Sequence, residues 1–487
     1  MTGVELMGSA PVGTAIIRLA LPMMVAMLAQ SIFQITDMYF IGQTGNPNMV
    51  AAVALASPLY MISQALGNIF ATGGSTYISR MLGAKNEGVA KNASAVSFYI
   101  ALSLGAVLCI ILMIFKTPLL WLIGASEATF EPTNNYFSVI AFAIPMAAAG
   151  GVMSGVMRSE GETQKAMTQQ LVGIVTNIIL DPILILWAGW GTTGAGLATV
   201  AATIVSFSYG IRYFLKRSAT LSILPSDFKP NKDMMGQILA IGVPAGAANI
   251  IMTFSNILVN RIASSHGDFV IAGNAVQMRV GGLFFMLIMA IVMGYQPFAG
   301  FNYGAKQYDR LRKGFKFTIL FATGLCVLAF FALQLVGEHL IRFFVNHDET
   351  IEYGVRILKV FLWGVPFMGA QITMMVSFQA LGKPLQSTIV IMGRSLLFYL
   401  PLLLVLNHFF GFDGFIWAQP ISDILTTGIA VVLGFSLIKI MRGLGSPAAG
   451  PAMGGPGGPP GLPPDGAPPS PLAGPPEGPS EGPPTGP

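Results

Sequence analysis

The chain has 487 residues, of which 53% are hydrophobic and only 10% are charged, whereas an average soluble domain carries about 25% charged residues. Together with a mean hydropathy of +0.68, this composition excludes an ordinary soluble protein and predicts an integral membrane protein with many spans. The net charge of +5 does not indicate nucleic-acid binding, because basic residues of membrane proteins gather in cytoplasmic loops. Cys109 and Cys326 lie in apolar runs and suggest neither a disulfide nor a metal site.

Twelve segments are long and apolar enough to cross a bilayer, which takes about 20 mostly apolar residues in a helix. The predicted fold is therefore all-α, with twelve transmembrane helices. The segments lie near residues 15–40, 50–80, 92–115, 132–157, 166–188, 193–213, 236–262, 269–300, 314–336, 350–380, 386–407 and 414–438.

Lysine and arginine predict the orientation of these segments. The loops on one side of the predicted membrane hold 19 basic residues, and the loops on the opposite side hold five. The remaining two, Arg279 and Arg394, fall within segments. Because short cytoplasmic loops are enriched in lysine and arginine, we expect both termini to face the cytoplasm and the protein to lie in the plasma (inner) membrane.

The C-terminal stretch, residues 443–487, differs from the rest of the chain. It contains 16 prolines and 13 glycines and has no lysine or arginine. Such a composition cannot build a core and predicts a disordered cytoplasmic tail. A polyproline II segment that binds a partner is the alternative interpretation.

The chain repeats itself at an offset of about 221 residues. An offset of six segments keeps the same orientation in both copies, so the repeat is parallel and its symmetry axis runs along the membrane normal. We therefore predict an N-lobe (1–220) and a C-lobe (221–442) of six helices each, facing each other across a cleft. Gene duplication without a transport role is the alternative. The matching pairs are Pro22 with Pro244, Gly83 with Gly304, Pro145 with Pro366, Gly161 with Gly382, and Gly194 with Gly414.

Two carboxylates lie within apolar segments of the first half. Asp181 is four residues after Asn177, so both point to one face of the fifth segment, and Pro182 leaves a carbonyl of the preceding turn without its partner. Asp37 lies in the first segment and Thr199 in the sixth. These oxygen ligands suit a hard cation such as Na⁺, or a proton. The alternative is that the acids only bond neighbouring helices.

Further polar residues fall within the predicted spans. Arg394 and Asp423 have similar expected depths in the eleventh and twelfth segments, which predicts a C-lobe ion pair, either structural or part of a second coupling site. Other polar side chains are candidates for lining the cleft, or for hydrogen bonds between helices. These are Gln34, Gln64, Asn68 and Arg279.

Several motifs resemble the multidrug and toxic compound extrusion (MATE) family, in its bacterial and archaeal branch with an N-lobe cation site. The resemblance covers about residues 10–440 and implies that Asp37, Asn177, Asp181 and Thr199 form that site. It also implies that Pro22 bends the first helix. Another branch carries carboxylates in the seventh and tenth segments. The corresponding stretches here, NIIMTFSNILVNRI and FMGAQITMMVSFQALG, contain none, so the resemblance does not imply a C-lobe cation site of that kind. The motifs are DMYFIG, MLGAKN, RSEGETQKAM, TNIILDPILI, GAGLATVAAT and LFFMLIMAIVMGYQPFAGFNYGAKQYDRLRK.

The predicted function is secondary active efflux of cationic or amphipathic small molecules in exchange for Na⁺ or H⁺. The stretch SFQALGKP is a poor match to a phosphate-binding loop, so we expect no ATP hydrolysis, no enzymatic activity and no cofactor beyond the coupling ion. We expect a monomer in the lipid bilayer, without a nucleic-acid partner. A flippase for lipid-linked saccharides, or a receptor or scaffold that uses the tail, are the alternatives.

The 19:5 distribution of basic residues generates a topology prediction. A single cysteine at Glu127 or His347 should react with a membrane-impermeant thiol reagent added outside intact cells, whereas one at Glu87 or Asp233 should not. The background protein carries Cys109→Ala and Cys326→Ala. The opposite labelling pattern would invert the orientation.

Overall fold

The computed structural model describes residues 2–216, 218, 220–345, 347–441 and 486, and every regular element in these ranges is a helix. The predicted disordered tail therefore lies almost entirely outside the described residues. Side-chain caps begin several helices: Asn46, Asn86 and Asn231 each accept a hydrogen bond from a backbone N–H of the first turn that follows. Such caps satisfy donors that the helix itself leaves open.

The first half of the chain supplies six spans and two short helices, α1 (Gly3–Gly8) and α5 (Lys116–Leu122). Two of the spans change helix type along their length. The spans are α2 (Val12–Gly42), α3 (Pro47–Gly83), α4 (Glu87–Ile114), α6 (Glu127–Ile140) with η1 (Ala141–Ala143) and α7 (Ile144–Ser159), α8 (Thr163–Asp181) with η2 (Pro182–Trp187), and α9 (Gly191–Lys216).

The second half follows after the short η3 (Pro225–Asp227) and repeats this order. Its elements are α10 (Lys232–Ser265), α11 (Asp268–Gly304), α12 (Tyr308–Phe344), α13 (Asp348–Phe361), α14 (Val365–Ala380), α15 (Pro384–Met392), η4 (Gly393–Leu397) and α16 (Tyr399–Met441).

The prediction of twelve spans is confirmed, although two stretches of helix do not correspond to one span each. Helices α13 and α14 are bent by 52° and together form one span. The stretch Pro384–Lys439 is helical along its length except at Gly411, which has φ 55° and ψ −132°. Arg394 Nε and Asp423 Oδ1 lie 2.9 Å apart, whereas 29 residues of straight helix would separate the two residues by about 44 Å. The chain therefore reverses at Gly411 and crosses twice.

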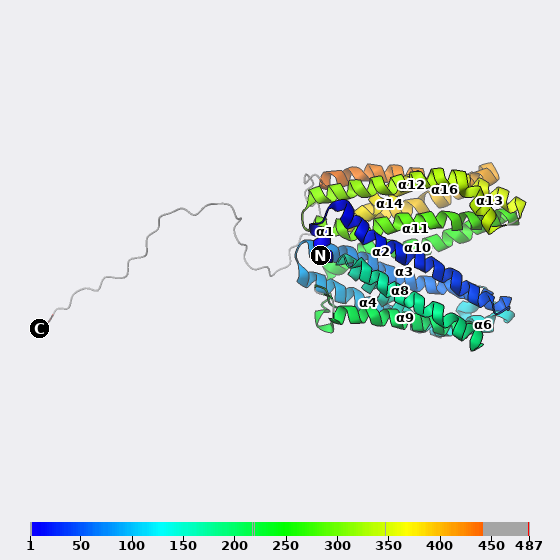
Figure 1. The fold of residues 1–487 in the computed structure, drawn as a ribbon, viewed down its shortest axis with the longest axis horizontal. Helices are drawn as coiled ribbons and strands as arrows, with labels where there is room; N and C mark the ends of the chain where they lie inside the picture. Colours follow the sequence, from blue (N-terminus) through cyan, green and yellow to red (C-terminus); the bar gives the residue numbers. More distant parts are fainter. Residues whose placement is uncertain (1, 217, 219, 346, 442–485, 487) are drawn as a thin grey trace. The chain divides into compact units, whose positions relative to one another are not determined.

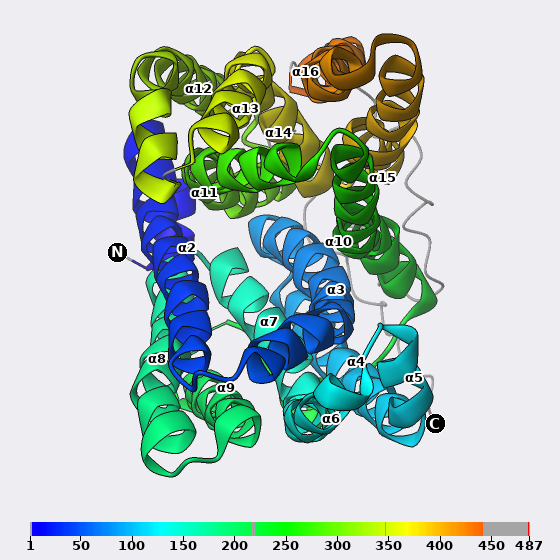
Figure 2. The same cartoon turned by 90° about the vertical axis from the view of Figure 1, so that its right-hand side faces the viewer.

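The two halves meet along α2, α3, α10 and α11, where α2 packs on α11 and α3 packs on both α10 and α11. Glycines make these contacts close. A Cβ at Gly242 would clash with the backbone carbonyl of Ile69, and one at Gly304 with that of Arg80. The halves touch at the end that carries α1 and diverge toward the opposite end (Figure 1). Figure 2 looks along the helices from that opposite end.

The short helix α1 touches both halves. A Cβ at Gly3 would clash with the carbonyl of Glu160, in the turn between α7 and α8 of the first half. Met7 is fully buried, and its carbonyl accepts hydrogen bonds from Asn302 at 3.1 Å and from Arg310 at 3.0 Å, both in the second half. Arg310 also donates to the carbonyl of Ala10 at 2.8 Å. Residues 2–10 therefore tie the two halves together at their closed end.

This tie predicts the effect of Arg310→Ala on stability. The substitution removes the charged donor from two backbone carbonyls and from Asn302 Oδ1, which Arg310 Nε reaches at 3.2 Å. Bonds to charged groups contribute about 1.5–3 kcal/mol each when shielded from water, so we expect a loss of about 1–3 kcal/mol for this half-buried side chain. The measurement is the thermal denaturation midpoint in detergent.

The control is Arg342→Ala at the other end of α12. Arg342 pairs with Glu338 at 3.0 Å, and both side chains are about half exposed, so this pair is expected to contribute about 0–1 kcal/mol. Equal midpoints for the two variants would contradict a stabilising tie through Arg310.

Candidate functional site

The structure brings three of the predicted site residues into contact in the first half. Asn177 and Asp181 lie on α8 and are 1% and 0% exposed, and Thr199 lies on the adjacent α9, which packs against α8. The four-residue spacing places both α8 side chains on one face, one turn apart. A buried carboxylate, an amide and a hydroxyl therefore share one interface between two helices.

The Asn177 amide links its two neighbours. When its nitrogen faces the carboxylate, it donates to Asp181 Oδ2 at 2.8 Å, and its oxygen accepts from the backbone N–H of Thr199 at 3.3 Å. In the opposite amide orientation it donates to Thr199 Oγ1 at 3.4 Å. The Thr199 hydroxyl itself donates to the carbonyl of Ala195 at 3.0 Å. The first orientation leaves the lone pairs of Thr199 Oγ1 open to a further partner.

The helix changes type directly after Asp181. Helix α8 ends at Asp181, and the π-helical η2 begins at Pro182. Proline has no backbone N–H to donate to the carbonyl four residues before it, and π-helical turns often mark functional sites for this kind of reason. The predicted break beside the carboxylate is present, and the carbonyl of Ile178 lacks its usual N–H partner four residues later.

Asp37 approaches the same site from α2, which packs against α8. Its side chain is half-buried, and α2 contacts both α8 and the η2 stretch that follows Asp181. Two like charges in a membrane interior repel each other strongly unless a cation or a proton lies between them. The arrangement therefore combines negative charge with oxygen ligands, which suits a hard monovalent cation or a shared proton.

Among the described residues, the remaining candidates make no contact with this set that the structure records. Pro22 is buried inside α2, about four turns before Asp37. Gln34, Gln64 and Asn68 are exposed on α2 and α3, and Arg279 is exposed on α11. A role of these four residues in lining a substrate path stays a prediction.

The second half contains a buried ion pair between Arg394 and Asp423. Arg394 Nε donates to Asp423 Oδ1 at 2.9 Å, and the Asp423 side chain is 1% exposed. Gln419 donates to the other carboxylate oxygen at 3.3 Å. Sequence reasoning missed Gln419, although its position four residues before Asp423 on the same helix was the available signal.

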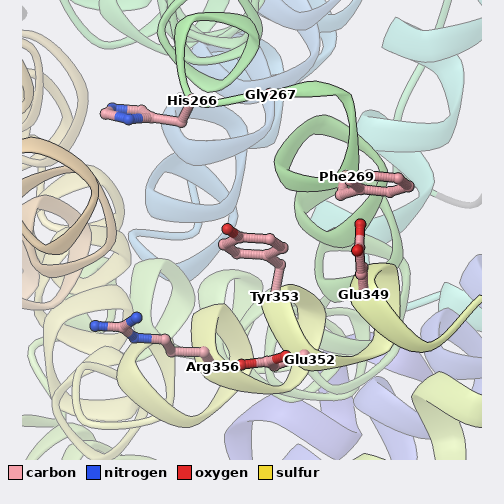
Figure 3. A pocket seen from close by; sticks show the side chains of 7 residues that line it. All are labelled: His266, Gly267, Phe269, Glu349, Glu352, Tyr353 and Arg356. Atoms are coloured by element: carbon pink, nitrogen blue, oxygen red, sulfur yellow. The ribbon is translucent and has the colours of Figure 1, made fainter.

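A groove lies at the turn between α10 and α11 and contains none of the predicted site residues. Its lining includes His266, Phe269, Tyr353 and Arg356 (Figure 3). Arg356 is already paired with Asp413 at 2.6 Å, and both side chains are more than half exposed. The groove is therefore a surface feature of the second half, separate from the polar set around Asp181.

Comparison with known proteins agrees with this architecture. The multidrug export protein MepA of Staphylococcus aureus (strain MSSA476) is 30% identical over 427 residues, which is 88% of this chain and 94% of that protein. MepA of Staphylococcus haemolyticus is 29% identical over 423 residues, which is 87% of this chain and 93% of that protein.

Solved structures share the fold. A crystal structure of MATE in complex with MaL6 has a TM-score of 0.85 at 23% identity, covering 91% of this chain and 99% of that one. A MOP superfamily transporter from Pyrococcus furiosus has a TM-score of 0.84 at 23% identity, covering 90% and 98%. The MatE family model matches twice, at residues 22–183 and 244–405, which agrees with the predicted internal repeat. The chain therefore belongs to the MatE family, that is, to the multidrug and toxic compound extrusion (MATE) transporters.

Proposed function

We propose that this protein exports cationic or amphipathic small molecules across the plasma membrane in exchange for Na⁺ or H⁺. The coupling ion binds at Asp37, Asn177, Asp181 and Thr199. The observation that carries this proposal is the fully buried Asp181 carboxylate, which is bonded by Asn177 and lies on α8, a helix that packs against the α2 helix of the second acid, Asp37. The name of the MepA relatives, multidrug export protein, supports the substrate class.

The mechanism follows from the arrangement of the two halves. They touch at the end that carries α1 and diverge toward the other end, which suits alternating access by rocking of one half against the other. Ion binding neutralises the two acids and so changes the free energy of packing α2 against α8. An ion that binds one arrangement more tightly than the other shifts the equilibrium between them. The bound ion therefore determines which end is open.

Neutralising either acid is predicted to abolish coupling. Asp37→Asn and Asp181→Asn should each lower ion-driven substrate efflux from proteoliposomes at least tenfold, because the exchanged ion loses its counter-charge. A charge in the membrane interior costs about 2.5–3.5 kcal/mol on insertion scales, so the thermal stability of both variants should hold or rise.

The matched control for these two variants is Asp309→Asn. Asp309 is 89% exposed on α12, so its neutralisation should leave efflux unchanged. Full efflux by both site variants, or aggregation of both, would mean that the acids serve structure and not coupling.

The chemistry of the site also predicts how Na⁺ binding depends on pH. We favour Na⁺ at this site, with protons competing for the same carboxylates, because protonating either acid removes negative charge that the cation needs. Na⁺ affinity of the purified protein should therefore fall as pH is lowered. Thr199→Ala removes a neutral oxygen ligand and should weaken Na⁺ binding more than it disturbs pH-driven efflux.

Thr203→Ala is the control for this variant, since Thr203 lies one turn later on α9 and makes the same kind of bond, to the carbonyl four residues before it, at 2.8 Å. The absence of Na⁺ binding at every pH, with efflux still driven by a pH gradient alone, would leave the proton as the coupling ion.

A further inference from the structure

Arg394 binds its partner acid by one edge of its guanidinium group only. Nε donates to Asp423 Oδ1 at 2.9 Å, and the second carboxylate oxygen is occupied by Gln419. The backbone carbonyl of Arg394 accepts from the Ser422 hydroxyl at 3.1 Å. Helix α16 therefore binds both the side chain and the backbone carbonyl of Arg394, which holds the guanidinium in one orientation.

The other edge of the guanidinium lacks an oxygen partner among the described residues. An arginine has five N–H donors, and here four of them belong to Nη1 and Nη2. Nη2 reaches only the Met368 sulfur at 3.9 Å, a weak acceptor, and the group lies over the Phe285 ring at 5.4 Å. The side chain is 26% exposed. A planar pair of donors is thus positioned and unfilled, which is the geometry that binds a carboxylate in a bidentate manner.

This unfilled edge lies beside the contact between the two halves. Phe285, on which the guanidinium rests, lies on α11 and precedes Met286, whose sulfur accepts from the Ser31 hydroxyl of α2 at 3.0 Å. Asp37 lies six residues further along α2, which is about 9 Å of helix. Arg394 therefore packs against α11, and α11 in turn contacts α2, the helix that carries Asp37.

The internal repeat places Arg394 close to the equivalent of the ion site. Gln419 follows Gly414 by five residues, as Thr199 follows Gly194. Arg394 follows Gly382 by 12 residues and Asn177 follows Gly161 by 16, a difference of about one helical turn on the same face. Corresponding regions of the two halves therefore carry different groups: buried or half-buried carboxylates in the first half, and in the second half an ion pair whose Arg394 side chain is 26% exposed.

We propose that the Nη edge of Arg394 binds an anionic group, in particular a carboxylate, on the transported molecule. A transported molecule that carries a carboxylate then places this group against Arg394. Asp423 and Gln419 are positioning residues that hold the guanidinium in place. This inference rests on the proposed export function, whose substrate class it extends.

The partial neutralisation of the Arg394 charge by Asp423 suits a transport site. An unpaired arginine inside a membrane would bind any anion tightly and release it slowly, whereas a guanidinium already paired through Nε retains directional donors with little net charge. Phe285 offers an aromatic face next to those donors, and Met368 is an adaptable apolar neighbour. The site therefore recognises a carboxylate attached to an aromatic or apolar body and not a small hydrated anion.

The test compares two ligands that differ only in the carboxylate. The probes are a fluorescent aminoxanthene dye with a free carboxylate and the ethyl ester of the same dye, which keeps the cation and the rings. Equilibrium binding to the purified full-length protein is measured for both, and efflux from proteoliposomes is measured in parallel. Arg394→Gln should lower the affinity for the zwitterion relative to the ester about tenfold or more, as expected for the loss of charge-assisted bonds.

Two further variants separate recognition from folding. Arg394→Gln leaves Asp423 buried without its cation, so the double variant Arg394→Met with Asp423→Leu removes both charges and keeps an apolar core of similar volume. It should show the same loss of preference for the zwitterion. Arg356→Gln is the control, since Arg356 forms an exposed ion pair in the same half and should leave the ratio unchanged.

The outcomes are distinct. A ratio of affinities that stays at its wild-type value in both Arg394 variants overturns the inference, and so does an equal loss of affinity for both dyes. A changed binding ratio without dye efflux by the wild-type protein would support the carboxylate site and contradict the proposed export function. A changed ratio with efflux of both dyes supports both.

Discussion

The structure depends on one constraint: a polar group inside a membrane must find its partner within the protein, because no water is available there. Asp181 illustrates it, with its carboxylate fully buried and bonded by Asn177 on the same face of α8. Asp423 meets the same constraint with Arg394 and Gln419. Asn177 in turn accepts from the Thr199 N–H of α9, and Asp423 of α16 binds Arg394 of η4, so each buried acid is linked to a second helix.

The duplicated architecture places these constraints at two related positions. Each half carries a polar group where its fifth and sixth spans pack together, and each interrupts the fifth span with a π-helical stretch, at Pro182–Trp187 and Gly393–Leu397. The charges differ between the halves, since the first has two acids and the second has a balanced pair.

Close backbone contact explains how the halves hold together without large side chains. Gly242 and Gly304 let helices of one half approach the backbone of the other, as is common where helices pack inside membranes. Such contacts form without desolvating charged groups. The helix α1 adds hydrogen bonds to the same end through Arg310 and Asn302.

Much of the fold could be predicted from the sequence, because membrane spans are defined by length and hydropathy, which are local properties. The repeat, the number of spans and the break at Pro182 belong to this group. The spacing of Asn177 and Asp181 likewise predicted one shared face, because the helix repeat relates residues four apart.

Only the tertiary structure decided which side chains of different helices contact each other. The sequence predicted the Arg394–Asp423 pair from depth alone, but it could not show that the pair uses Nε and leaves the other edge without an oxygen partner. It also missed α1 as a tie between the halves, since six residues outside the spans carry no periodic signal. Contacts of this kind depend on side-chain direction and on residues hundreds of positions apart, which no local pattern encodes.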